Sequence, residues 1–354
     1  MTSIMKAVPV SSSQTSLRER LQGLVNRFSL GRVLVAGDVI ADQFIYGEVS
    51  RVSREAPVLI LKYDATEMVP GGAGNAANNV AALSGRASLA GIVGADAEGR
   101  RLTAGLVRGV DRSLILRIRG YRTPIKTRIL AGGIHSPKQQ VVRIDREIAS
   151  PRAASALRAF EARLRRALSH CDAVILSDYG SGLITPALAR MVRAVLARRS
   201  KRHIPVLIDS RYRLLDYRHQ TLCTPNEAEV EHLLGVRIDD NRRVLERAGR
   251  EILRRTRSLA VLVTRGSRGM ALFEPGRTPE LISIFGSDEV ADVTGAGDTV
   301  IATVALALTA GATFGEAARL ANYAGGLVVM KRGTATVSVR ELRAAINSDL
   351  KDVR

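Results

Sequence analysis

The chain of 354 residues has no tryptophan, two cysteines and few aromatic side chains, which make up 4% of its residues. Cys171 and Cys223 lie far apart, so they form neither a disulfide framework nor a paired metal motif, and they suit a reducing cytoplasm. The longest apolar run, residues 300–314, contains Thr and Gly and is too short for a membrane span. The first residues lack the basic start and apolar core of a secretory signal. We therefore expect a cytoplasmic protein in which residues 1–29 form a mobile tail.

Acidic residues are scarce relative to basic ones, with 34 Asp and Glu against 53 Lys and Arg, which gives a formal charge of +19. A basic protein attracts anions such as nucleic acid, membrane phosphate or phosphorylated metabolites. The scarcity of aromatics argues against stacking on single-stranded nucleic acid. Many arginines fall in helical stretches such as residues 241–257, which indicates solvated helix faces. Because no nucleic-acid module is recognisable either, we expect a small anionic partner.

Short apolar runs alternate with longer amphipathic stretches along the chain. This alternation predicts right-handed βαβ units and a mainly parallel sheet covered by helices on both faces. The expected strands are residues 32–37, 87–94, 173–180, 205–210, 259–266 and 269–274, and the expected helices are 74–84, 97–109, 152–169, 186–200 and 240–256. Residues 43–66 and 114–145 interrupt the pattern with half-polar strands, which predict a small separate sheet over one end of the core.

The most informative motif is DVTGAGDTV at residues 292–300, which leads into an apolar helical run. A glycine-rich turn at a helix N-terminus is an anion site, because free N–H groups and the helix dipole both face the ligand. Asp298 in the first turn is well placed to accept a hydroxyl proton beside a transferring phosphoryl group. The alternative is that Asp298 only caps the helix. No Gly-Lys-Ser/Thr follows, so the motif is not a P-loop.

This motif resembles the C-terminal signature of the ribokinase-like, or PfkB, carbohydrate kinases, and PGGAGNAANNVAALSG at 70–85 resembles their second signature. Further strings in the right order are similar to the heptose 7-phosphate kinases of lipopolysaccharide core synthesis. They are residues 37–58, 126–147, 176–182, 222–231, 263–272 and 321–338. The resemblance implies a ribokinase-like three-layer α/β sandwich over residues 30–354, with a mainly parallel sheet and a β lid formed by about 43–66 and 114–145.

The resemblance also implies the site residues. Asp298 would be the catalytic base, with the amides of Gly295, Ala296 and Gly297 as the anion hole. The sugar would contact Asp38, Gly71, Gly72 and Asn75. The residues themselves also indicate a phosphate on the substrate, because the lid segments carry a basic and polar cluster in which Arg128 and Arg143 are the first candidates to bind it. The cluster consists of Arg51, Arg54, Lys126, Arg128, Lys138, Gln140 and Arg143. The nucleotide would lie against Asn226, Glu229, Thr264, Gly266, Gly269 and Asn322, with Glu229 also facing metal-bound water.

Structural interpretations compete with several of these roles. Asp38 could cap a loop and Asn75 could simply begin a helix. Asn226 and Glu229 have the spacing of a capping box. The lid arginines could protect edge strands from aggregation.

The reaction implied by the resemblance is ATP-dependent phosphorylation of the 1-hydroxyl of D-glycero-β-D-manno-heptose 7-phosphate, with Mg²⁺ screening the charge of ATP. A PfkB-type kinase of another sugar or sugar phosphate is the alternative. Exposed lid edges favour a homodimer. The five histidines are isolated and no His-x-Gly-His motif of an adenylyltransferase occurs, so we expect the stand-alone kinase. The sequence departs from the family pattern at Arg54, where Pro is usual, and at Ser181, where Lys is usual. It also has Asp209-Ser210-Arg211 where Asp-Pro-Lys is usual, which keeps one positive charge, and Ala291 in place of an aromatic residue.

Overall fold

A mostly parallel sheet forms the centre of the protein in the computed structural model, which describes residues 12–132, 138–146, 154–199, 203–286, 292–331 and 333–349. Its strand order is β14-β13-β12-β11-β10-β9-β1-β4-β5, with β6 beside β4, and β12, β13 and β14 pair antiparallel. These strands are β1 (Arg32–Gly37), β4 (Arg86–Gly94), β5 (Val110–Asp111), β6 (Ile115–Ile118), β9 (Ala173–Asp178), β10 (Val206–Ser210), β11 (Leu222–Cys223), β12 (Ala260–Thr264), β13 (Met270–Phe273) and β14 (Glu280–Ile282).

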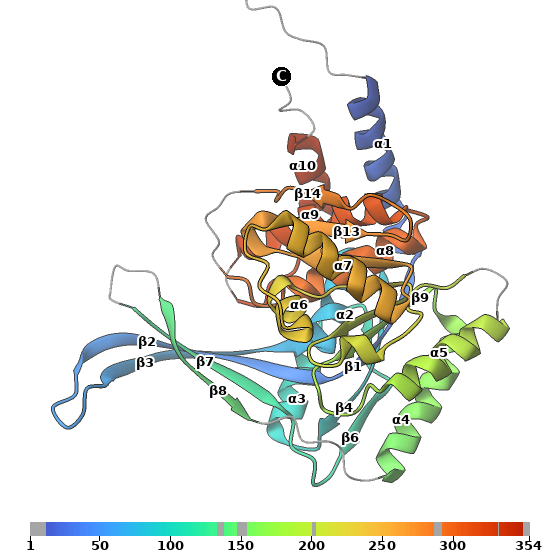
Figure 1. The fold of residues 1–354 in the computed structure, drawn as a ribbon. Helices are drawn as coiled ribbons and strands as arrows, with labels where there is room; N and C mark the ends of the chain where they lie inside the picture. Colours follow the sequence, from blue (N-terminus) through green and yellow to red (C-terminus); the bar gives the residue numbers. More distant parts are fainter. Residues whose placement is uncertain are drawn as a thin grey trace, which may run out of the picture.

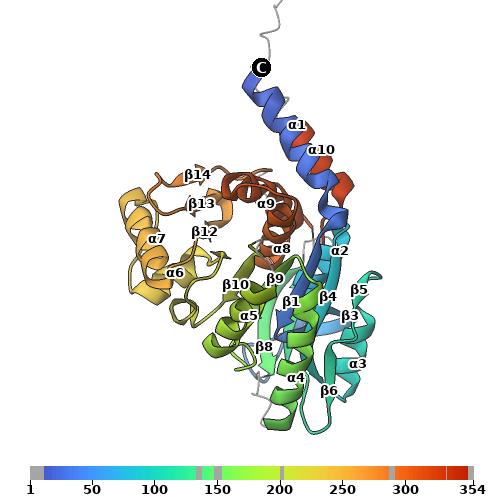
Figure 2. The ribbon, with the colours of Figure 1, turned by 90° about the vertical axis from the view of Figure 1, so that its right-hand side faces the viewer.

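Helices cover both faces of this sheet (Figures 1 and 2). Successive side chains of β1 point to opposite faces of the sheet, and both sets are apolar, so both faces need a covering layer. Val33 and Val35 enter one hydrophobic core, whereas Leu34 and Ala36 enter the other. The first core is completed by α2 (Ala73–Ala82), α3 (Ala97–Ala104), α8 (Ala296–Thr309), α9 (Phe314–Val329) and α10 (Val339–Asp349). The second is completed by α4 (Ala154–Ala167), α5 (Pro186–Arg199), α6 (Glu227–Leu234) and α7 (Arg242–Thr256). The predicted three-layer α/β sandwich is confirmed.

A separate four-stranded sheet extends away from the body (Figure 1). Its order is β3-β2-β7-β8, with β2 and β7 parallel. The strands are β2 (Val39–Val52), β3 (Leu59–Gly72), β7 (Ile125–Gly132) and β8 (Gln139–Arg146), and we call this sheet the lid. Its bounds differ from the predicted 43–66 and 114–145 because residues 115–118 form β6 and pair with β4 from Gly91 onward. Burial of Ile115 against the core keeps that segment in the central sheet.

Period-two alternation gives the lid two chemically different faces. The inner face carries Lys126 and Arg128 of β7, with Asp42 opposite Lys126 on β2 and Arg143 opposite Arg128 on β8. The outer face carries exposed apolar side chains such as Ile144 of β8, beside the hydrogen-bonded polar pair Thr127 and Gln43. The inner face is therefore the one suited to an anionic ligand.

The N-terminal region is ordered where the structure describes it, so the predicted mobile tail over residues 1–29 is wrong for its second half. Residues Ser12–Asn26 form α1, followed by a 3₁₀ turn, Phe28–Leu30. Helix α1 lies beside α10 (Figures 1 and 2), and Leu21 and Leu24 are fully buried there. The signal was the helical spacing of Leu17, Leu21, Leu24 and Phe28. Residues 1–11 lie outside the described part of the chain. No helix among the described residues is long and apolar enough to cross a membrane.

Truncation of the α1 contact tests this correction. Leu24→Ala should lower the free energy of unfolding by about 2–5 kcal/mol, because it leaves a cavity in the main core. Gly23→Ala in the same helix should raise it by about 0.5–1 kcal/mol, because a Cβ there meets no atom within 4 Å and alanine favours the helix. Urea denaturation measures both changes. Equal stability of Leu24→Ala and the wild type would mean that α1 does not contribute to the core.

Candidate active site

The glycine-rich turn begins helix α8, and its conformation requires glycine. Gly295 is the N-cap of α8 with φ +78°, and a Cβ there would lie 2.4 Å from Nδ2 of Asn75. Asp292 braces the turn, since its carboxylate accepts hydrogen bonds from the amides of Thr294 (2.8 Å) and Gly333 (3.1 Å). Asp298 lies in the first turn of α8 and makes no capping hydrogen bond, so the helix-cap alternative does not describe its geometry.

The Asp298 carboxylate is held by two donors from other elements. Asn75 of α2 donates to one oxygen at 2.9 Å, and the Tyr179 hydroxyl after β9 donates to the other at 3.3 Å. Asn75 is itself fixed, because Asn79 donates to its side-chain oxygen at 3.0 Å and receives a bond from Thr299 of α8. This network joins α2 and α8 and aims the carboxylate in one direction.

Burial raises the pKa of Asp298 to about 7, because the carboxylate is only 3% exposed. The hydrogen bond from Asn75 acts against burial by stabilising the ionised form, whereas the nearby negative charge of Asp42 raises the pKa further. A carboxylate with a pKa near neutral pH can both accept and release a proton under physiological conditions.

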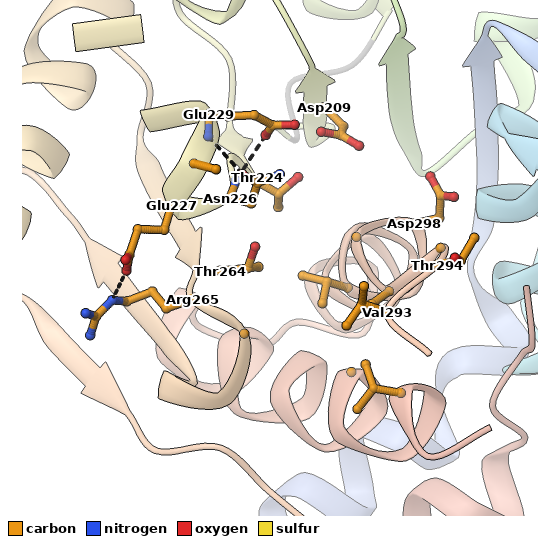
Figure 3. Close-up of a pocket in the computed structure, with 18 of the residues that line it drawn as sticks. Asp209, Thr224, Asn226, Glu227, Glu229, Thr264, Arg265, Val293, Thr294 and Asp298 are labelled. Atoms are coloured by element: carbon orange, nitrogen blue, oxygen red, sulfur yellow. Dashed lines mark hydrogen bonds and ion pairs between the residues drawn. The ribbon is translucent and has the colours of Figure 1, made fainter. Parts of the chain in front are cut away.

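A cavity of about 810 Å³ opens in front of Asp298 and is bounded by the lid, by α6 and by the turn after β12. In Figure 3, Asp298 lies across the cavity from Asn226 and Glu229 of the α6 end, and Asp209 lies between Glu229 and Asp298. Of the residues predicted on the sugar side, Gly72, Arg128, Gln140 and Arg143 line the cavity. All six residues predicted on the nucleotide side line it too: Asn226, Glu229, Thr264, Gly266, Gly269 and Asn322.

The remaining predicted sugar-side residues lie outside the cavity lining. Asn75 contacts Asp298. Gly71 leaves room for Asp42, since a Cβ on Gly71 would lie 2.2 Å from the Asp42 carboxylate.

Asp38 is buried and accepts hydrogen bonds from the Tyr179 amide (2.8 Å) and from the amide and hydroxyl of Ser181. Burial raises the pKa of Asp38 to about 6. Ser181, the departure from the family pattern, is thus a partner of Asp38.

The two possible roles of Asn226 and Glu229 coexist in the structure. Their side chains form the capping box of α6, with Asn226 accepting from the Glu229 amide at 2.8 Å and Glu229 accepting from the Asn226 amide at 3.0 Å. Both side chains also line the cavity. Burial raises the pKa of Glu229 and of neighbouring Asp209. The capping box therefore positions a carboxylate at the cavity wall.

Several cavity residues were not among the predicted site residues. They are Asp42, Tyr179, Asp209, Arg211 and Glu227. Lys126, one of the basic lid residues predicted from the sequence, lines the cavity as well, and so does Arg265, which forms a 2.6 Å ion pair with Glu227. Asp209 and Arg211 had a local signal, since charged residues at the end of a parallel strand, or directly after it, collect at the carboxyl edge of the sheet. Asp42 had none, because its position depends on lid register and on the absence of a side chain at Gly71.

A family model for pfkB family carbohydrate kinases matches residues 32–341 of this sequence. The chain belongs to the pfkB family. It is accordingly a carbohydrate kinase. The pfkB match spans both glycine-rich signatures and the whole cavity.

Curated relatives of this pfkB-family chain include proteins named bifunctional protein HldE. That of Caulobacter sp. strain K31 is 42% identical over 328 residues, covering 92% of this chain and 64% of the relative. That of Desulfatibacillum aliphaticivorans is 39% identical over 324 residues, covering 91% and 64%. The chain thus spans about two thirds of the length of these relatives.

Solved structures of other kinases share the fold. A ribokinase from Arabidopsis thaliana, complexed with ribose and ATP, aligns with a TM-score of 0.65 at 21% identity and covers 91% of this chain and 99% of that chain. Phosphofructokinase-2 from Escherichia coli in complex with fructose-6-phosphate aligns with a TM-score of 0.68 at 16% identity, covering 90% and 99%. At these identities the likeness establishes the architecture of the pfkB-family chain.

The partners of Asp298 predict opposite pH effects in two variants. If Asp298 must be ionised for turnover, kcat/KM should fall below about pH 7 in the wild type. Asn75→Ala removes a bond that favours the ionised form, so the acid limb should move to higher pH by on the order of one pH unit. Asp42→Asn removes a repelling charge, so the limb should move to lower pH. Rate profiles from pH 5 to 9 measure this, and shifts in the same direction would contradict the assignment.

Proposed function

We propose that this protein is a heptose 7-phosphate kinase that transfers the γ-phosphoryl group of ATP to the 1-hydroxyl of D-glycero-β-D-manno-heptose 7-phosphate. The observation that carries the proposal is the position of Asp298 across one cavity from the α6 end, under a lid whose inner face is basic. The HldE relatives and the motif resemblance to heptose kinases support this branch of the pfkB family. The wider activity of the longer relatives is not assigned to this chain.

In the proposed reaction, the sugar hydroxyl oxygen forms a bond to the γ-phosphorus of ATP. The bond between that phosphorus and the β–γ bridging oxygen breaks, and ADP leaves with the electron pair. The hydroxyl proton passes to the Asp298 carboxylate, which Asn75 and Tyr179 hold in place. The amides of Gly295, Ala296 and Gly297 face the transferred group from the α8 N-terminus.

The lid supplies the proposed site for the 7-phosphate. Arg128 and Arg143 are cross-strand neighbours on β7 and β8, and each is ion-paired, Arg128 to Asp42 and Arg143 to Asp145, both at 2.7 Å. An ion-paired guanidinium keeps further N–H donors, because five are available in its planar fork. Gln140 lines the cavity on the same strand as Arg143.

Magnesium fits this site as an ion held mainly by ATP and water. Among the described residues, no three His, Cys, Asp or Glu side chains are grouped as a direct metal site. Asp209 and Glu229 are carboxylates at the cavity wall and would contact the water ligands of the ion, which keeps several waters in kinase sites. The ion would supply charge neutralisation on the phosphates.

A substrate panel tests the proposed function. ADP release would be followed at fixed ATP with heptose 7-phosphate, fructose 6-phosphate, ribose and ribose 5-phosphate. We expect the highest kcat/KM for the heptose phosphate, with phosphate incorporated at C1. A higher value for a hexose or pentose substrate would identify the alternative, a pfkB-type kinase of another sugar.

Asp298→Asn keeps the shape of the proposed base but cannot accept the proton. The turnover number should fall about a hundredfold to ten-thousandfold, with the low end expected if the proton leaves late in a loose transition state. ATP affinity should hold or rise, because a negative charge facing the phosphate is removed. Turnover assays and calorimetry measure the two effects. A folded variant within threefold of wild-type turnover would exclude Asp298 as the base.

Removal of a lid arginine should affect one substrate selectively. Arg143→Ala and Arg128→Ala should raise the KM for the sugar phosphate at least tenfold and change the KM for ATP little, because each removes phosphate donors. Asp145→Asn is the matched control: it removes the partner of Arg143 and keeps the guanidinium. Equal changes in both KM values would remove these arginines from the phosphate site.

We also propose that the lids of two chains pair in a homodimer. The outer face exposes Val142 (48%) and Ile144 (56%), apolar area that a second lid would cover. Sedimentation at micromolar concentration should show about twice 38.1 kDa. Ile144→Lys should shift the species toward the monomer, and a wild-type monomer would contradict lid pairing.

A further inference from the structure

The positive charges of the cavity are not all balanced. Six cationic side chains line it, and four of them form ion pairs with carboxylates. The pairs are Arg128 with Asp42, Arg143 with Asp145, Arg265 with Glu227, and Arg268 with Glu227 and Asp240. Lys126 and Arg211 form no ion pair with any residue that the structure describes.

Lys126 lies beside the group that holds the proposed base. Its Nζ is 4.4 Å from the centroid of the Tyr179 ring, and the Tyr179 hydroxyl donates to Asp298 at 3.3 Å. The aromatic face attracts the ammonium without neutralising it. Burial lowers the pKa of Lys126; the negative charge of Asp42 opposes this effect, and the positive charge of Arg211 adds to it, so Arg211 lies near enough to act on Lys126.

Arg211 is directed toward the nucleotide side by the end of β10. Its amide donates to the carbonyl of Asp178 at 3.0 Å, which fixes the backbone one residue beyond the strand. Its charge opposes the rise in the pKa of both Asp209 and Glu229, which places the guanidinium near these carboxylates. Arg211 therefore faces the same side of the cavity as the capping box of α6.

We propose that Lys126 and Arg211 form a clamp for the phosphoryl group in transfer, one cation reaching it from the acceptor side and the other from the nucleotide side. Neither side chain is held in a contact ion pair with a described residue, so both keep N–H donors for an incoming anion. The transferred group is the anion that would lie between Asp298 and the α6 end. The ion-paired Arg128 and Arg143 lie farther out on the lid and remain the site proposed for the phosphate of the sugar.

The two cations of the clamp form and break no covalent bond in the proposed reaction. As the acceptor oxygen bonds to the γ-phosphorus and the bridging oxygen leaves with ADP, the charge on the three equatorial oxygens is shared by Lys126 and Arg211. The proton still passes to Asp298. Fixed cations already in place stabilise this charge without reorganisation, which is how such groups favour the transition state.

Nucleotide binding without sugar tests the clamp directly. This inference rests on the proposed kinase function, but it does not require the heptose, so the test stands even if the sugar panel fails. Lys126→Met and Arg211→Gln should each weaken ATP about tenfold by calorimetry and change ADP less than twofold, because ADP lacks the γ-phosphoryl group. With the best sugar substrate, kcat should fall about a hundredfold.

Matched variants separate the clamp from a folding defect. Arg213→Gln removes an arginine two positions away that pairs with Asp216 and does not line the cavity, so it should leave ATP affinity unchanged. Lys126→Arg and Arg211→Lys keep the charge and should recover most of the ATP preference over ADP. Lys126→Met should also move the acid limb of the rate profile to higher pH, because Lys126 favours the ionised form of Asp298.

Two results would overturn the clamp. If both neutral variants raised the KM for the sugar phosphate and left the ATP to ADP ratio unchanged, the two cations would serve the phosphate of the sugar. If neither affinity nor kcat changed in folded variants, the unbalanced charge would have no part in transfer.

Discussion

The hydrogen bond from Asn75 to Asp298 connects the two glycine-rich segments of the protein, and the geometry of the site depends on it. It joins the first turns of α2 and α8, which follow unrelated parts of the sequence. A buried carboxylate with no donor would become neutral, because burial disfavours its ionised form. The amide donor keeps the ionised form accessible near neutral pH, and the Asn79–Thr299 bond maintains the amide orientation. Gly295 is needed because any side chain there would occupy the position of this amide.

Charge in the cavity is arranged by the lid as much as by the central sheet. The register of β2, β7 and β8 places Asp42, Lys126 and Asp145 side by side, with Arg128 and Arg143 one step further along. Ion pairs with Asp42 and Asp145 therefore occupy part of the charge of Arg128 and Arg143, whereas Lys126 lines the cavity without such an ion pair among the described residues. A basic sequence composition does not reveal this, because compensation depends on cross-strand neighbours.

Much of the fold could be predicted from the sequence, because apolar segments typical of strands alternate with amphipathic segments typical of helices along most of the chain. The glycine-rich motif also indicated the position of Asp298, since a turn of this kind at a buried helix N-terminus has few other uses. The bounds of the lid could not be predicted, because half-polar strands of β6 and β7 look alike until Ile115 is seen against the core. The enclosure of Asp38 by Ser181 and the approach of Asp42 to Gly71 depend on tertiary contacts, which have no local pattern. Helix α1 differs from the predicted mobile tail although its apolar spacing is helical, because a short amphipathic segment at a chain end becomes ordered only through tertiary contacts such as those of Leu21 and Leu24.

Both ends of the lid hairpin are anchored directly at the site. Strand β2 begins two residues after β1 ends, and β3 ends at Gly72, where α2 begins. No flexible linker separates the lid from Asn75, three residues further on. The direction in which the lid leaves the body is therefore set by the same short segment that places the first turn of α2 and its hydrogen bond to Asp298.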